Sequence, residues 1–142
     1  MKISAKTEYA CIAILELAIR HGSGEPVRMR DLADAHGIPS RFLVQILLQL
    51  KGAGLVGTTR GAAGGYQLLR SPEQITLGDV MTIVEGEATP QSNVSVDSPL
   101  VRALLAAWQD AHEKLSNSLH SITFAELAAQ ADDARSEQMY YI

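Results

Sequence analysis

The chain has 142 residues, a formal net charge of −4 and a hydrophobic content of 46%. This length and composition are typical of one compact domain with an appended element. Its longest apolar runs are far shorter than the roughly 20 residues that span a bilayer, and its start lacks the apolar region of a signal peptide. With a single cysteine, Cys11, the chain can form no internal disulfide. We therefore expect a cytoplasmic protein without a membrane segment.

Charge is divided unevenly along the chain. Residues 1–72 carry nine Lys or Arg and five Asp or Glu, a net of +4, whereas residues 73–142 carry three and eleven, a net of −8. This division predicts that the N-terminal half meets an anion and that the C-terminal half has another role.

Apolar spacing and capping residues predict three helices in the basic N-terminal half. Residues 4–19 place apolar side chains at helical spacing, with Ser4 and Thr7 as candidate N-caps. A break with glycines and a proline leads to a short helix at 30–37, which a glycine closes. A third helix starts afresh at Pro39–Ser40, and its apolar face is predicted to hold Phe42, Leu43, Ile46, Leu47 and Leu50. Two short helices joined by a tight turn outline a helix-turn-helix.

A glycine-rich stretch, RGAAGGYQLLRSP at residues 60–72, follows the third helix. The β-type runs LVGTTR and YQLLR flank its glycines and predict a two-stranded hairpin, which in this position is a wing. Gly61, Gly64 and Gly65 are expected to let the loop take positive φ and approach another surface closely. Arg60 and Arg70 place positive charge at its ends, so we expect the loop to lie along a phosphate backbone.

The acidic half predicts further helices. Thr76 is a candidate cap for a helix in ITLGDVMTIVEG, and residues 87–97 form a polar loop. From Ser98–Pro99 a long helix is predicted, and a TFAE capping box at 123–126 opens a last short helix. Apolar residues recur every seven positions along the long helix and form what we call the heptad stripe, a predicted dimerisation surface: Val101, Trp108, Leu115 and Ile122.

The predicted fold is mainly α with a small β-hairpin. Residues 1–85 form a winged helix-turn-helix DNA-binding domain, 86–97 a loop, 98–131 a dimerisation helix with a short capping helix, and 132–142 a loose tail.

Four stretches resemble the Rrf2 family of bacterial winged-helix transcription regulators: SAKTEYA, IPSRFLVQIL, GLVGTTRGAAGGYQL and SITFAEL. The resemblance extends over residues 1–127, and the wing stretch is its most specific part. It implies a homodimer, and we expect this regulator to act as a repressor of transcription. Each subunit would place a recognition helix in a major groove of double-stranded DNA and a wing arginine in or beside a minor groove.

The resemblance also assigns DNA-binding residues: Lys6 and Ser40 at phosphates, Arg41 and Gln45 at base edges, and Arg60 and Gly61 at the wing contact. Side-chain chemistry supports the base contacts, because arginine pairs with guanine and glutamine with adenine, each discriminating by roughly 1–3 kcal/mol. Val44 stands where some relatives have an acidic residue, so the target sequence stays open.

No cofactor and no metal is expected. Several family members hold a 2Fe–2S cluster through three cysteines around the loop before the dimer helix, and thiolates are its usual ligands. This chain has no cysteine there, and Arg102 and Leu105 stand where the last cysteine and a nearby histidine would be. Cys11 is predicted to be a small buried apolar residue, with a redox-sensing thiol as the alternative.

The sequence also bears on two classes of protein other than a DNA-binding regulator. An enzyme is not expected, because no nucleophile can be paired with a base and no set of metal ligands is present. The alternative is a winged-helix interaction module whose partner protein docks on the acidic C-terminal half. An unknown effector that enters between the wing domain and the dimer helix also stays open.

Overall fold

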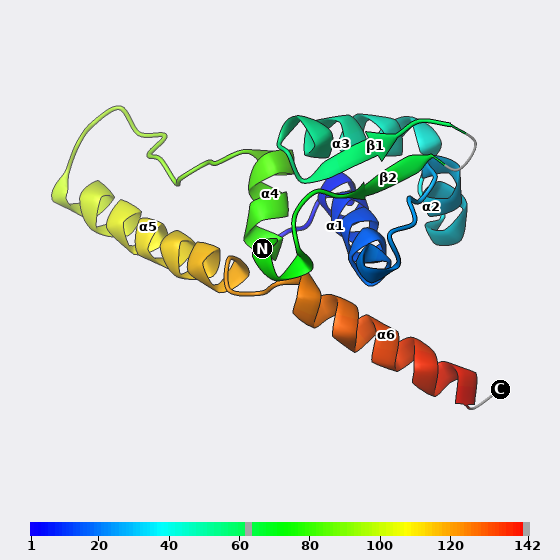
Figure 1. Ribbon diagram of the computed structural model, residues 1–142. Coiled ribbons are helices and arrows are strands. Elements are labelled where there is room, and N and C mark those ends of the chain that lie inside the picture. The colour runs from blue at the N-terminus through cyan, green and yellow to red at the C-terminus, as the bar shows by residue number, and fades with distance from the viewer. Residues whose placement is uncertain (62–63, 141–142) are drawn as a thin grey trace.

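A computed structural model describes residues 1–61 and 64–140 (Figure 1). Its elements are α1 (Ala5–Ile19), η1 (His21–Ser23), α2 (Met29–His36), α3 (Ser40–Gly52), β1 (Val56–Thr59), β2 (Gly65–Leu68), η2 (Pro72–Gln74), α4 (Leu77–Glu85), α5 (Pro99–Leu119) and α6 (Phe124–Tyr140). The prediction of a mainly α fold with one small hairpin is confirmed.

Of the side chains predicted to start helices, Ser4, Thr76 and Ser98 do so, whereas the candidate cap Thr7 lies within α1. The Ser4 hydroxyl accepts a hydrogen bond from the Thr7 amide at 3.1 Å, and the Ser98 hydroxyl accepts one from the Val101 amide at 3.2 Å. Thr76 forms a reciprocal capping box at the start of α4. These bonds satisfy amides that have no partner within the helix, which explains why the helix starts could be located from local sequence.

An apolar core holds α1, α3 and α4 together. Leu43, Ile46, Leu47 and Leu50 of α3 are fully buried in it. Phe42 was predicted on the same face, but it is 44% exposed, because successive residues of an α-helix are turned by about 100°. Burial of one face of α3 fixes its opposite face toward solvent.

The hairpin is antiparallel, with Val56 opposite Leu68 and Thr59 opposite Gly65. Val27, in the segment before α2, pairs with Tyr66 through two backbone hydrogen bonds of 2.8 and 2.7 Å. This pairing attaches the hairpin to the helix-turn-helix.

The wing glycines serve different purposes. Positive φ is confirmed for Gly61 at 106° and for Gly65 at 159°, but that prediction is wrong for Gly64. A Cβ on Gly64 would lie 2.3 Å from the Thr59 carbonyl oxygen, so this position requires glycine because the backbone approaches it closely.

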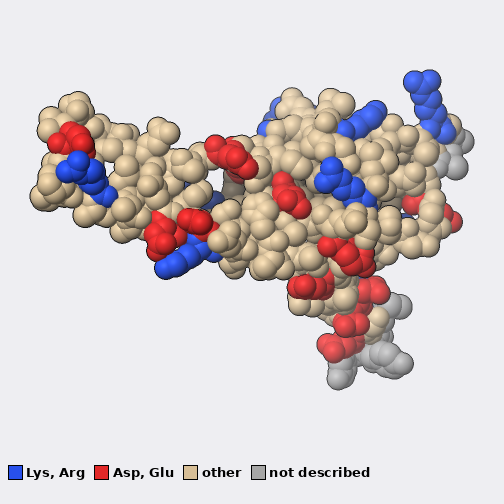
Figure 2. All heavy atoms as spheres, turned by 60° about the vertical axis from the view of Figure 1, so that its left-hand side comes forward, with Lys and Arg blue, Asp and Glu red and all other residues tan. Residues whose placement is uncertain are grey.

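Charge follows the architecture (Figure 2). Basic side chains are seen on the upper part of the molecule, where Figure 1 places α3 and the hairpin, and acidic ones gather on the lower projecting part, where α6 lies; charges of both signs are seen on the rest of this face. The sequence of α3 contains Arg41 and Lys51 and no acidic residue. An anionic partner is therefore favoured on the α3 side of the molecule.

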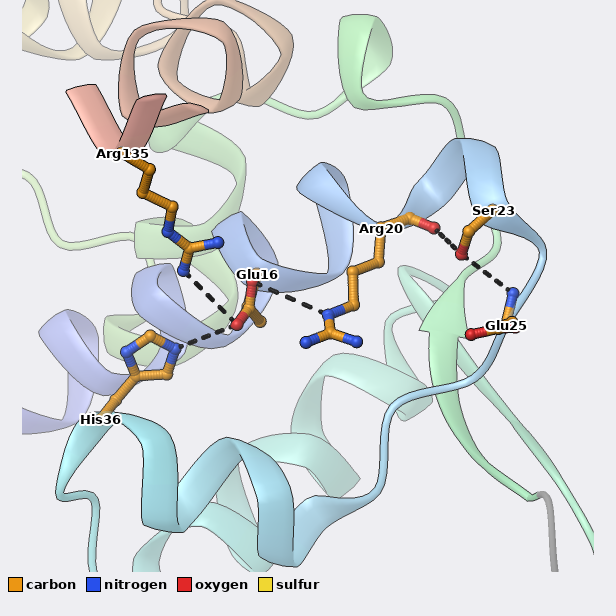
Figure 3. A network of polar contacts seen from close by, with 6 residues as sticks. All are labelled: Glu16, Arg20, Ser23, Glu25, His36 and Arg135. Carbon is orange, nitrogen blue, oxygen red and sulfur yellow. Dashed lines mark hydrogen bonds and ion pairs between the residues drawn. The ribbon is translucent and has the colours of Figure 1, made fainter. Parts of the chain in front are cut away.

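A buried carboxylate connects three helices (Figure 3). The side chain of Glu16 on α1 is 7% exposed, and its oxygens lie 3.5 Å from His36 Nε2 on α2, 3.6 Å from Arg135 Nη2 on α6 and 4.0 Å from Arg20 Nε. His36 is half-buried and faces Glu16. Such contacts between distant residues cannot be located from local patterns.

The C-terminal third differs from the prediction at two points. Ile122 lies beyond the end of α5, and its carbonyl accepts a hydrogen bond from the Leu77 amide at 2.9 Å, so it is not part of a stripe on that helix. The predicted short last helix is α6, which has 17 residues. Residues 132–140 belong to this helix instead of forming a loose tail, and residues 141–142 lie outside the described part.

Candidate DNA-binding surface

The outward face of α3 brings the two predicted base-reading residues together. Arg41 and Gln45 are both exposed and lie one helical turn apart. Val44 and Leu48 flank them and are 39% and 60% exposed. The four residues thus form one solvent-facing surface opposite the buried face of the helix.

Arg41 is held by its neighbour. Its Cζ atom lies 5.0 Å from the centroid of the Phe42 ring, within the range of a cation–π contact. Phe42 therefore has a use outside the core, since it restricts the guanidinium at the first turn of α3. Ser40 is exposed as the first residue of the same helix, where free amides favour a phosphate.

The wing residues lie at the tip of the hairpin. Arg60 and Gly61 are exposed directly after β1, and the Gly61 carbonyl accepts a hydrogen bond from the Gly64 amide at 3.0 Å. Two residues before Arg60, Thr58 Oγ1 on β1 lies 3.3 Å from Lys51 Nζ on α3. The recognition helix and the first wing strand are thus joined by a polar contact that sequence reasoning did not find.

Lys6 is in a different environment from the other five predicted residues. It is exposed in the first turn of α1, near the carboxylate of Glu85 at the end of α4. Hydrogen bonds from Ser4 and Thr7, with a smaller contribution from the charge of Lys6, hold the pKa of Glu85 below its usual value. The Lys6 ammonium consequently has an acidic neighbour within the protein.

A groove runs between α4, the loop after it and α5. Met81, Leu115 and Leu119 contribute apolar surface to it, and Glu85 and His112 contribute polar groups. The groove therefore lies between the wing domain and the long helix. This is the place at which an unknown effector would enter, an alternative that the sequence leaves open.

Cys11 is partly buried on α1 and packs against the core. Burial raises the pKa of its thiol to about 11. Because the thiolate is the reactive species, we predict that iodoacetamide at pH 8 modifies Cys11 in the native protein roughly 100-fold more slowly than in the unfolded chain. Mass spectrometry over a time course, with and without urea, measures both rates. Equal rates would contradict the burial of the thiol.

The residues present do not fit an iron–sulfur cluster. Cys11 is the only cysteine, it lies on α1, and residues 86–98 contain neither cysteine nor histidine. In the ranges 1–61 and 64–140 no group of three or more His, Cys, Asp or Glu side chains is placed to hold a metal ion. The same ranges contain no helix long and apolar enough to cross a membrane.

A helix-turn-helix followed by a hairpin, with an exposed arginine and glutamine on the outward face of its second helix, defines a winged-helix DNA-binding protein. Residues 3–130 match the family Rrf2, which is described as an iron-dependent transcriptional regulator. The HTH-type transcriptional regulator CymR of Bacillus subtilis is 34% identical over 142 residues, 100% of both chains. The HTH-type transcriptional regulator IscR of Serratia proteamaculans is 33% identical over 138 residues, covering 93% of this chain and 82% of that protein.

Solved structures agree with these matches. The structure of CymR, the global cysteine regulator of B. subtilis, superposes with a TM-score of 0.76 at 35% identity, over 92% of this chain and 98% of that one. IscR of T. potens gives a TM-score of 0.77 at 30% identity, over 94% and 90%. The chain belongs to the Rrf2 family and is a DNA-binding transcriptional regulator.

Proposed function

We propose that this regulator acts in the cytoplasm as a homodimeric repressor that binds an imperfect palindrome in duplex DNA. Arg41 and Gln45 on α3 contact base edges in the major groove, and Ser40 and Lys6 contact phosphates. Arg60 and Gly61 contact the minor groove or its edge.

The observation that supports a homodimer is the solvent exposure of α5. This helix has 21 residues and none of them is buried. Leu100, Leu104 and Trp108 are 80%, 52% and 54% exposed. A contiguous apolar surface of this kind is uncommon on a monomer, and pairing it with its copy about a two-fold axis covers it. The same axis sets two copies of α3 one or more duplex turns apart, which favours a palindromic operator.

The direct test is a selection of bound duplexes from a randomised pool at moderate salt. We expect one palindromic sequence to be enriched, and in-vitro transcription from a promoter that carries it to fall when the protein is added. If no sequence is enriched, the proposed operator-binding function is wrong, and an interaction module with a protein partner becomes the better explanation of the acidic α6.

Arg60→Ala tests the wing. Each phosphate neutralised contributes about −0.9 to the slope of log K against log salt. We predict that Arg60→Ala weakens binding to the selected duplex and either makes this slope shallower by about 0.9 or removes a minor-groove sequence preference. Fluorescence anisotropy at several salt concentrations measures both.

The matched control is Arg102→Ala. Arg102 is an exposed arginine on α5 and faces Asp97 at 3.3 Å. Its replacement should leave both the affinity and the slope unchanged. An equal loss in the two variants would mean that overall charge, and not the wing contact, determines binding.

A further inference from the structure

The outward face of α3 carries more apolar surface than its packing requires. On the core-facing side of the helix, the side chains are already fully buried: Leu43, Ile46, Leu47 and Leu50 are all inaccessible to solvent. Val44 and Leu48 are on the other side, 39% and 60% exposed. Since neither contributes to the core, their apolar surface is available to a partner.

Val44 and Leu48 form a row beside the polar residues. They are four positions apart and therefore lie one above the other on the helix surface, as Arg41 and Gln45 do. The spacing of three between Arg41 and Val44, and between Gln45 and Leu48, makes the two rows neighbours. A partner that hydrogen-bonds to Arg41 and Gln45 is thus within reach of the apolar row.

DNA offers one apolar group on the base edges of its major groove. In the major groove, thymine presents its C5-methyl group, whereas the other base edges present hydrogen-bond donors and acceptors. The charge of the helix favours an anionic partner, because α3 carries Arg41 and Lys51 with no acidic residue. This charge suits the phosphates on both sides of a groove.

We propose that Val44 is a specificity-determining residue that contacts a thymine methyl group in each half-site, and that Leu48 extends this contact toward a second methyl group. This inference rests on the proposed placement of α3 in the major groove. It predicts a thymine adjacent to the bases read by Arg41 and Gln45. The half-site is thereby read by two kinds of contact, hydrogen bonds from the polar row and methyl packing from the apolar row.

The experiment replaces thymine by deoxyuridine, which removes the methyl group and keeps the base pair. The probe is the duplex enriched from a randomised pool, and each thymine is substituted in turn. We expect Kd to rise about fourfold for each methyl group that the protein buries, at one or two positions per half-site. Substitutions elsewhere should have no effect.

Variants assign the effect to the side chain. In Val44→Ala the ratio of deoxyuridine to thymine affinities at the sensitive position should approach one. Leu48→Ala should act in the same way at a second sensitive position, if the scan finds one. The side chain of Val44 lies outside the core, so Val44→Ala should fold normally, which thermal melting verifies. Val96→Ala makes the same truncation at a residue that is 67% exposed in the loop before α5, and it should preserve the full deoxyuridine effect.

A second probe restores the methyl group on another base. Replacing cytosine by 5-methylcytosine at the sensitive position, after the thymine pair is changed to a cytosine pair, should recover part of the affinity for the unmodified protein and none for Val44→Ala. This separates contact with the methyl group from readout of the adenine partner.

The outcomes test the thymine-methyl contact separately from the proposed operator-binding function. An enriched duplex with no thymine sensitive to deoxyuridine overturns this inference and leaves the operator-binding function intact. Sensitivity that persists unchanged in Val44→Ala overturns the role of Val44. If no duplex is enriched at all, the proposed operator-binding function fails and this inference fails with it.

Discussion

Leu115→Asp is expected to abolish the dimer and, with it, specific binding to DNA. Leu115 lies on α5 with Val101 and Trp108 at intervals of seven. Burying an aspartate in a pairing surface costs several kcal/mol unless the helices separate. A monomer engages a single half-site and loses the gain from linked binding, so operator affinity should fall by roughly 100-fold or more. Arg41 and Arg60 are unchanged in this variant.

Sedimentation and DNA titration check the two parts separately. The control is Asn117→Asp, which adds the same charge to an exposed position of α5 outside the heptad stripe and should leave a dimer. If Leu115→Asp remains a well-folded dimer, the stripe is not the dimer interface. A monomer that keeps full operator affinity would instead refute the coupling between dimerisation and recognition.

The parts of the fold that sequence predicted are those determined within a few residues. A cap such as Ser98 bonds to an amide three positions away, and Gly37 closes α2 with a φ of 65°. Both signals act within one turn of the chain, so they can be recognised without knowing what the helix packs against.

The parts that were missed depend on residues far apart. Arg135 meets Glu16 from the other end of the chain, and residues of α6 such as Leu127 pack on the core. A helix with weak local sequence signals is stabilised by such contacts, so the local sequence of residues 132–140 does not distinguish this helix from a tail. The heptad pattern likewise includes Ile122, because nothing in the local sequence indicates that its carbonyl accepts a hydrogen bond from the Leu77 amide.

The candidate site was predicted mainly through the family resemblance. The exposure of Arg41, Gln45 and Arg60 is compatible with the assigned roles, and their contacts with DNA stay a prediction. The apolar row of Val44 and Leu48 needed the structure, because the same sequence pattern also suits a helix that is buried on two sides.

Gly65→Ala is the second substitution for which we expect a large effect, and it acts on the attachment of the wing. A Cβ at this position would lie 2.5 Å from the Val27 carbonyl oxygen and 2.6 Å from its carbon. These are backbone atoms, so they cannot rotate away as a side chain would. The strand must move instead, and the two hydrogen bonds between Val27 and Tyr66 would lengthen or break.

We predict that Gly65→Ala lowers the free energy of unfolding by about 2–4 kcal/mol, from overpacking and lost hydrogen bonds together, and that it weakens operator binding because Arg60 is no longer held in place. Urea unfolding and anisotropy titration measure the two effects.

Gly22→Ala serves as the control, since a Cβ there meets nothing within 4 Å and stability should be unchanged or slightly higher. Gly61→Ala distinguishes a steric clash of the added Cβ from strain in the backbone. A Cβ at Gly61 also meets nothing within 4 Å, but the φ of this residue is 106°, so only a strain of roughly 1–3 kcal/mol is expected. If Gly65→Ala is as stable as Gly22→Ala, the close approach of the hairpin to Val27 does not hold the wing on the helix-turn-helix.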